Sequence, residues 1–137
     1  MIAVYNWGVI MILFVYGTLL SGLERSYVLD GSIFISEATA IAKLYNLGDY
    51  PGIKNGDGIV HGELYDVDDI TLEELDQIEG FDSNNFNNSL YLRSEIRIIA
   101  PTIIIPVYSY FYNLQIDDEM LIEDGDYRKF LKSSTVR

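Results

Sequence analysis

Apolar residues recur along most of this chain at every second position or in short continuous runs, which is the pattern of β-strands. The predicted strands cover residues 10–16, 38–45, 59–67, 90–99 and 103–113. Pro106 restricts the start of the last strand to a sheet edge or a bulge, because proline has no N–H to donate. The segments GDYPG and KNGDG carry turn-forming residues and are predicted to lie between strands.

One segment has the period of a helix instead. Thr71 is predicted to cap its N-terminus, with Glu74 three residues later as the reciprocal partner of a capping box. The helix continues through LEELDQIE and ends at Gly80, a residue type that favours the position just after a helix. A second, weaker helical pattern lies near residues 119–131. Short strands with few helices predict the α+β class, as a small mixed β-barrel with a few short helices.

The chain has the length of a single domain, and we expect residues 1–137 to form one. Within it, residues 1–10 are interpreted as an apolar N-terminal extension and residues 114–137 as an acidic C-terminal tail. The first twenty residues are long enough to span a bilayer, but polar and glycine positions interrupt them and no basic residue precedes them. We therefore interpret them as an extension before a buried strand, with either Met1 or Met11 as the true start.

Charge and composition exclude several kinds of function. Apolar residues make up 49% of the chain, while 21 acidic against 9 basic residues give a net charge of -12. Such a surface repels nucleic acids and anionic membranes. There is no cysteine, which excludes disulfides and thiolate catalysis and fits a cytoplasmic location. The single histidine, His61, cannot form a histidine-rich metal site and is interpreted as a structural residue of its strand.

The predicted helix carries a carboxylate on its apolar side. Glu79 follows Leu75 by four residues and Leu72 by seven, so its side chain leaves the helix along the same stripe. Partial burial raises the pKa of a carboxyl group toward neutrality, as a general acid/base requires. Alternatively, Glu79 turns out to solvent or pairs with Arg93 or Arg97.

Two further features are candidates for ligand contact. In FVYGTLL, residues 14–20, a strand ends at Gly17 and Thr18, which leaves backbone N–H groups that suit a carboxylate. The same residues equally fit a simple turn, and the Gly-Lys-Ser/Thr ending of a phosphate loop is absent. Alternating tyrosines share one face of the last strand, where they form a core stripe or contact a polar ligand. These are Tyr108, Tyr110 and Tyr112.

Together these motifs resemble the γ-glutamylcyclotransferase-like family, in its AIG2-like and γ-glutamylamine cyclotransferase branch. The resemblance rests on FVYGTLL, ATAIAKLYNLGDYPGI, VHGELYDV, TLEELDQIEGF, YLR and VYSY, which occur in the family's order. It implies a compact mixed barrel and an enzyme that needs no metal or organic cofactor. It also implies a reaction, in which the free α-amino group of a γ-glutamyl substrate attacks its own γ-carbonyl. The products are 5-oxoproline and an amine or amino acid.

The resemblance also implies roles for individual residues. The family's binding loop corresponds to Tyr16, Gly17, Thr18 and Leu19. Its general acid/base glutamate corresponds to Glu79, and a late-strand tyrosine of some members corresponds to Tyr110. The alternative function is a module of the same fold that binds a small amino-acid derivative without turnover.

Three segments depart from the family's pattern. They are the N-terminal extension, the Asn-rich residues 81–90, and the tail beyond Asn113. We expect residues 81–90 to border the pocket and so to influence substrate choice. The leaving group and the oligomeric state stay open.

Overall fold

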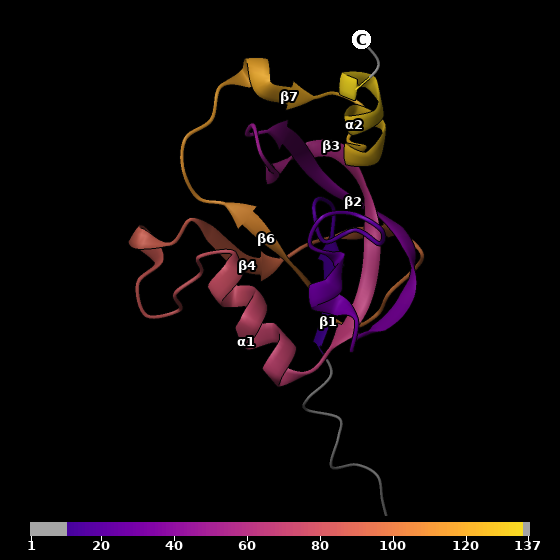
Figure 1. Ribbon diagram of the computed structural model, residues 1–137, viewed down its shortest axis with the longest axis vertical. Helices are drawn as coiled ribbons and strands as arrows, with labels where there is room; N and C mark the ends of the chain where they lie inside the picture. Colours follow the sequence, from indigo (N-terminus) through magenta and orange to yellow (C-terminus); the bar gives the residue numbers. More distant parts are fainter. Residues whose placement is uncertain (1–10, 136–137) are drawn as a thin grey trace, which may run out of the picture.

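The computed structural model describes residues 11–135, so the predicted extension over residues 1–10 lies outside the described part (Figure 1). The strands are β1 (Met11–Val15), β2 (Ile33–Asn46), β3 (Pro51–Val67), β4 (Tyr91–Glu95), β5 (Ile98–Ala100), β6 (Val107–Tyr112) and β7 (Leu121–Ile122). The helices are α1 (Asp69–Ile78) and α2 (Tyr127–Thr135), with short 3₁₀ turns η2 (Ser26–Leu29), η3 (Phe86–Asn88) and η4 (Asp118–Met120). Within residues 11–135, neither helix has the length and apolar character needed to span a membrane.

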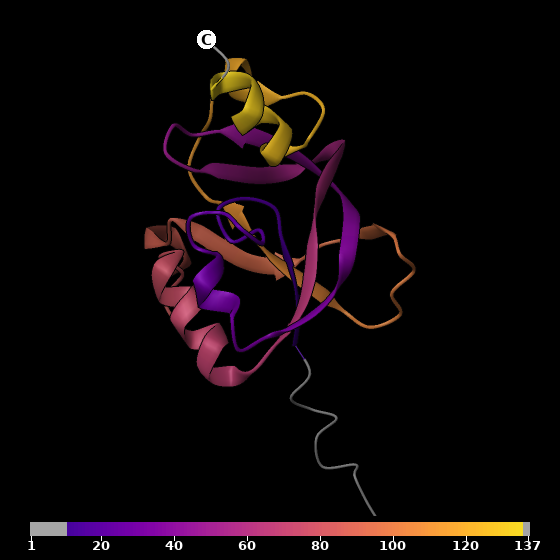
Figure 2. The same ribbon diagram turned by 45° about the vertical axis from the view of Figure 1, so that its right-hand side comes forward.

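The strands form one mixed sheet in the order β4-β6-β1-β3-β2-β5, with β7 added to β2. The pairs are antiparallel except that β6 runs parallel to β1 and to one position of β3. This architecture confirms the α+β class. The sheet curls strongly but does not close, so the word barrel describes it only loosely (Figures 1 and 2).

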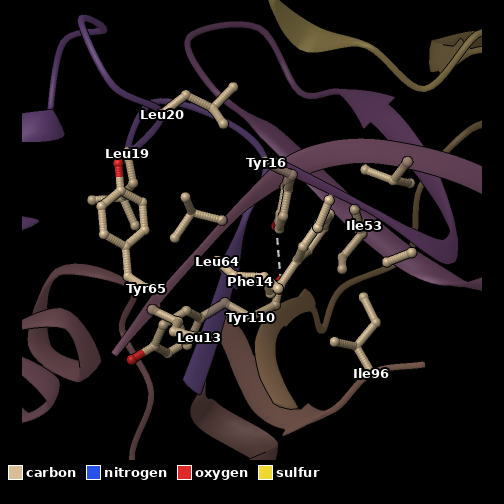
Figure 3. Packing of buried hydrophobic residues seen from close by; sticks show 14 of the residues in the cluster. Leu13, Phe14, Tyr16, Leu19, Leu20, Ile53, Leu64, Tyr65, Ile96 and Tyr110 are labelled. Carbon is tan, nitrogen blue, oxygen red and sulfur yellow. Dashed lines mark hydrogen bonds between the residues drawn. The ribbon is translucent and has the colours of Figure 1, made fainter. Parts of the chain in front are cut away.

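Strand β1 lies at the centre of the sheet, between β3 and β6. Leu13, Phe14 and Val15 are each no more than 3% exposed, because both faces of the strand are covered. Burial on both faces explains why this segment reads as a continuous apolar run rather than an alternating one. The core around it appears in Figure 3, where Leu64 of β3 packs beside Leu13 and Phe14. The loop after β1 is thereby fixed at one end to the most buried part of the molecule.

Helix α1 begins earlier than the sequence predicts. Asp68, rather than Thr71, is the N-cap, because its extended backbone lets its side chain accept the N–H of Thr71 at 2.7 Å. The helix ends as predicted at Gly80, whose φ of 66° is the left-handed conformation. The Phe81 N–H then bonds to the Asp76 carbonyl at 2.8 Å, which is the closing bond of a Schellman motif. This motif fixes the last turn of α1.

The hairpin of β2 and β3 is longer than predicted. Asn46 pairs with Pro51 beside the turn, and Lys43 pairs with Lys54 farther along. Strand β3 therefore runs through KNGDG, and the prediction of a loop there is wrong. The register shifts between Ile41, which pairs with Ile59, and Lys43, which pairs with Lys54, so residues 55–58 form an irregularity in the ladder rather than a separate loop.

The predicted strand over residues 90–99 divides into two. β4 pairs with β6, whereas β5 pairs with β2 on another part of the sheet. Ile96 lies between them and packs into the core at 8% exposure. Strand β6 begins at Val107, later than the predicted start at residue 103, because Pro106 has no N–H to donate to the sheet.

The segment after Asn113 is part of the fold rather than a separate tail. Strand β7 pairs with β2, and α2 begins at Tyr127, later than the predicted start near residue 119. The delay has a local cause, since β7 and the positive φ of Gly125 precede the helix. Tyr127 is only 4% exposed, so α2 docks through this ring. Figure 1 shows α2 and β7 together at the end of the β2–β3 hairpin.

Candidate active site

A pocket of about 200 Å³ opens between the end of β1, the end of α1 and the first residues of β3 and β4. Its walls are Phe14, Val15, Tyr16, Gly17, Thr18, Leu19, Arg25, Tyr50, Pro51, Ile78, Glu79, Leu90, Tyr91 and Tyr110. The set includes the residues to which the family resemblance assigns roles, namely Tyr16, Gly17, Thr18, Leu19, Glu79 and Tyr110. Segments more than ninety positions apart in the chain therefore meet in one pocket.

The Gly17 turn, residues 17–19, lines this pocket and contains backbone N–H groups that have no acceptor among the described residues. The Leu20 N–H bonds to the Gly17 carbonyl at 2.9 Å, and the Arg25 N–H bonds to the Thr18 carbonyl at 2.8 Å. Within residues 11–135, the N–H groups of Gly17, Thr18 and Leu19 donate to no acceptor. Three consecutive unpaired donors at a pocket wall form a site for an anionic oxygen.

A side chain at position 17 does not fit this turn. A Cβ on Gly17 would lie 2.5 Å from Cγ of Pro51, well inside van der Waals contact. The backbone of the turn therefore lies directly against the start of β3. This close approach, rather than unusual backbone angles, is the structural reason for glycine here.

Tyr16 and Tyr110 line the pocket with their rings, but both hydroxyl groups have partners in the protein. The Tyr16 hydroxyl donates to the Tyr110 carbonyl at 2.7 Å, as the dashed line in Figure 3 marks. The Tyr110 hydroxyl donates to Oδ1 of Asp76 at 2.6 Å. Burial raises the pKa of both phenols, so both remain protonated donors at neutral pH. Their main contribution is to hold β1, β6 and α1 together around the pocket.

Glu79 occupies the C-cap position of α1, one residue before Gly80. Its side chain points into the pocket wall and forms no hydrogen bond or ion pair with any residue the structure describes. Burial raises its pKa to about 7, while the nearby charge of Arg25 acts in the opposite direction. A carboxylate with this pKa is populated in both protonation states near neutral pH.

The alternative pairing of Glu79 with Arg93 or Arg97 is wrong. Arg93 binds Asp76 through two bonds, with Nε to Oδ1 at 3.0 Å and Nη2 to Oδ2 at 3.1 Å. Arg97 is exposed and is not part of the pocket wall. Asp76 therefore holds Arg93 and Tyr110 at once, and leaves Glu79 as the acidic group that faces the pocket.

Several residues of the wall were not predicted from the sequence. Tyr91 donates to the Pro51 carbonyl at 2.7 Å and packs against the Tyr50 ring. Arg25 lies beyond the Gly17 turn, just before η2, which Figure 2 shows beside α1. Position 91 belongs to the YLR segment of the family resemblance, which could have pointed to it. A lone arginine seven residues after Thr18 carries no such signal.

A second buried carboxylate anchors the loop that carries the Gly17 turn. Glu63, on β3, is 5% exposed and accepts the N–H and the hydroxyl of Ser21, each at 2.9 Å. It also accepts the Tyr65 hydroxyl at 3.0 Å and Nη2 of Arg128 at 3.0 Å. Burial raises the pKa of Glu63, but these hydrogen bonds outweigh burial and lower it overall.

The remaining predicted features lie partly in the pocket wall and partly outside it. His61 is exposed on β3, and its backbone N–H bonds to the Gly125 carbonyl at 2.8 Å. The expectation that residues 81–90 border the pocket is correct only for Leu90, because residues 81–89 do not line it. Of the three alternating tyrosines, Tyr110 is in the wall and Tyr112 packs edge-on against Tyr91. Within the described residues, no cluster of three His, Asp or Glu side chains could hold a metal ion.

Comparisons of the sequence with known proteins give one family. The family profile "Gamma-glutamyl cyclotransferase, AIG2-like" matches residues 13–129. The chain is 33% identical over 118 residues to the γ-glutamylcyclotransferase family protein YtfP of Escherichia coli K12, covering 85% of this chain and 96% of that protein. It is 28% identical to the γ-L-glutamyl-butirosin B γ-glutamyl cyclotransferase of Niallia circulans, covering 86% of this chain and 76% of the other.

A solved structure agrees at the level of the fold. The crystal structure of an AIG2-like protein from Mus musculus superimposes with a TM-score of 0.64 at 23% identity, covering 86% of this chain and 88% of that one. The family match also extends past Asn113 to residue 129, in agreement with the folded C-terminal segment. This chain therefore belongs to the AIG2-like γ-glutamylcyclotransferase family.

Proposed function

We propose that this protein is a γ-glutamylcyclotransferase that converts a γ-glutamyl compound into 5-oxoproline and a free amine or amino acid. The α-amino nitrogen of the substrate forms a bond to its own γ-carbonyl carbon, and the bond from that carbon to the leaving nitrogen breaks. Glu79 accepts the proton lost by the attacking nitrogen and donates a proton to the leaving nitrogen. No other reactant is consumed.

The observation that carries this proposal is the state of Glu79. It faces the pocket without a hydrogen-bond partner among the described residues, and its pKa is about 7. A group whose pKa is close to the working pH can take up and release a proton with little free-energy cost in either direction. A carboxylate present only for stability would have acquired partners, as Glu63 has.

The Gly17 turn supplies the complementary part of the site. Its three unpaired N–H groups suit the α-carboxylate of a γ-glutamyl group, as the predicted roles of Gly17, Thr18 and Leu19 require. With the carboxylate held there and the ammonium directed to Glu79, the substrate is bent into the shape of the product ring. Intramolecular attack then proceeds without the entropy loss of bringing two molecules together.

The relatives support the same chemistry. The name of the Niallia circulans protein describes γ-glutamyl cyclotransfer from γ-L-glutamyl-butirosin B. Tyr16 and Tyr110 have a supporting role in our proposal, since their rings close the pocket while their hydroxyl groups stay bound to the protein. A cytoplasmic location, independence from metal and organic cofactors, and a lack of nucleic-acid or membrane partners stay predictions from the sequence.

The test is release of 5-oxoproline from a panel of γ-glutamyl compounds, measured by mass spectrometry on protein treated with a chelator. We expect activity to survive chelation, and Glu79→Gln to remove it. Glu74→Gln is the matched control, because Glu74 is an exposed glutamate of the same helix. Substrate binding without 5-oxoproline in the wild-type protein would support the alternative, a binding module. Equal activity in the two variants would exclude Glu79 from the mechanism.

A further inference from the structure

Among residues 11–135, Arg25 is the one basic residue in the pocket wall. Its guanidinium group forms no hydrogen bond and no ion pair with the residues the structure describes. Arg93 binds Asp76 and Arg128 binds Glu63, while Arg97 is exposed to solvent and lies outside the pocket wall. Arg25 is only partly exposed, so an unpartnered charge here loses some of its hydration without compensation. This environment favours an anionic group brought in by a ligand.

The backbone fixes Arg25 beside the Gly17 turn. Its N–H bonds to the Thr18 carbonyl at 2.8 Å, so its side chain leaves the same loop that presents the three unpaired N–H groups. Glu79 lies in the same pocket but forms no ion pair with Arg25, although their charges interact. The pocket therefore has two separate sites for anionic groups, the turn and Arg25, and one carboxylate.

The γ-glutamyl group itself uses only part of this arrangement. Its carboxylate occupies the N–H groups of the turn, and its ammonium is directed to Glu79, as in the function proposed above. The charge of Arg25 then remains for the other part of the substrate, which is the leaving group. A cationic amine there would be repelled, and a neutral one would leave the guanidinium without a partner.

We propose that Arg25 selects γ-glutamyl compounds whose leaving group carries a carboxylate, namely γ-glutamyl amino acids and peptides, over γ-glutamyl amines. This inference rests on the proposed function, because it concerns the second half of the same substrate. Arginine suits the role, since its planar guanidinium can bind a carboxylate through two parallel hydrogen bonds. The apolar side chains of Ile78 and Leu90 in the same wall lower the local dielectric and strengthen such a pair.

The test uses two substrates that differ by one group. γ-Glutamylalanine carries the carboxylate, and γ-glutamylethylamide is the same molecule without it. We expect kcat/KM to favour γ-glutamylalanine by about 10- to 100-fold, the usual worth of one charge-assisted interaction. Arg25→Met should remove this preference mainly by lowering kcat/KM for γ-glutamylalanine. Arg25→Lys should retain part of the preference for γ-glutamylalanine. Lys129→Gln, which removes an exposed positive charge on α2, should retain all of it.

Other outcomes separate this inference from the proposed function. If Arg25→Met lowers kcat/KM equally for both substrates, Arg25 acts on the γ-glutamyl half, and the inference is overturned. A wild-type protein that shows no preference between the two substrates would also overturn it. Calorimetric dissociation constants of both compounds provide a readout that needs no turnover. A carboxylate preference in binding that depends on Arg25, without release of 5-oxoproline, would overturn the proposed function and support the inference.

Discussion

Glu63 and Glu79 both lie beside the loop of residues 16–25, and both carboxylates are withdrawn from water. Glu63 accepts hydrogen bonds from Ser21, Tyr65 and Arg128. Glu79 accepts none from the described residues. The pKa of Glu63 is lowered and that of Glu79 is raised to about 7, although burial acts on both in the same direction. Hydrogen-bond partners, and not burial alone, decide which carboxyl group can exchange protons.

The two glutamates lie near different parts of the loop of residues 16–25. Glu63 holds Ser21 in place, and Arg128 of α2 reinforces this contact by donating to the Ser21 carbonyl at 2.6 Å. Gly17 and Thr18, a few residues earlier, lie at the pocket that Glu79 faces. A stable anchor on one side of the loop thus holds the N–H groups on the other side in position, which is how precise binding sites are supported in general.

The largest expected difference between Glu79 and Glu63 is the effect of their replacement on the turnover number. Glu79→Gln should lower the turnover number by about 10²–10⁴-fold, the usual contribution of a general acid/base. Glu63→Gln should lower it by less than Glu79→Gln does, because Glu63 transfers no proton in the reaction and acts only through the position of the loop. Steady-state rates, normalised to the folded fraction from circular dichroism, give both values. A loss of similar size in the two variants would remove the distinction.

The order of the two variants should be reversed for the free energy of unfolding, which Glu63→Gln should lower more than Glu79→Gln. Glu63→Gln places an amide NH₂ among the donors of Ser21, Tyr65 and Arg128, so we expect the free energy of unfolding to fall by about 1–3 kcal/mol. Glu79→Gln should leave stability unchanged or raise it, because an amide costs less to bury than a charge. Urea unfolding measures both, and Glu74→Gln serves as the exposed control. A destabilised Glu79→Gln would show that Glu79 has a structural partner.

The pH dependence of stability sharpens the same contrast. The folded-state pKa of Glu63 is depressed, so its stabilising contribution is complete above the unfolded value near 4.5 and is lost as the pH falls through the folded value. The folded-state pKa of Glu79 is raised, so the folded protein binds the extra proton between about 4.5 and 7. Its ionisation therefore lowers stability as the pH rises through that window.

Urea unfolding of wild type and both variants over this range tests the two signs. The stability difference between Glu79→Gln and wild type should grow as the pH rises from about 4.5 to 7 and then stay constant. The deficit of Glu63→Gln should instead shrink only at acidic pH, where Glu63 itself becomes protonated in the wild type. A Glu79→Gln difference independent of pH would contradict the raised pKa.

Local sequence patterns predict the features that depend on local structure. The helical stripe places Glu79 correctly, because Leu72, Leu75 and Gly80 all lie within one turn or two of it. The Gly17 turn follows from an apolar strand that ends in glycine. The sequence prediction places the N-cap of α1 three residues too late, at Thr71 instead of Asp68. Both residue types can cap a helix, and only the backbone geometry decides between them.

The other parts of the site depend on contacts between distant segments. Glu63 reads in the sequence as one polar position of an alternating strand, yet its partners Ser21 and Arg128 lie 42 and 65 residues away. Arg25 reads as an ordinary polar residue until η2 packs beside α1 and brings it to Glu79. The family resemblance supplies motif positions, but it does not extend to such individual pairs.

The smallest expected effect is on the pKa of Glu79 itself. The charge of Arg25 lowers this pKa against the effect of burial, so Arg25→Met should raise it above its value of about 7. The change should be modest, because the two groups form no direct ion pair and part of the field is screened by solvent. In the wild type, the lowering of the Glu79 pKa by Arg25 should become smaller as salt is added. In Arg25→Met, the Glu79 pKa should depend less on ionic strength.

Carbon-13 NMR titration of labelled glutamate carboxyl groups measures the pKa, and Glu79→Gln identifies the signal. Lys129→Gln, which removes an exposed positive charge that is not part of the pocket wall, should leave the Glu79 pKa unchanged. A Glu79 pKa that is the same with and without Arg25 would mean that burial alone sets the proton affinity of Glu79, and that the charge of Arg25 has no effect on it.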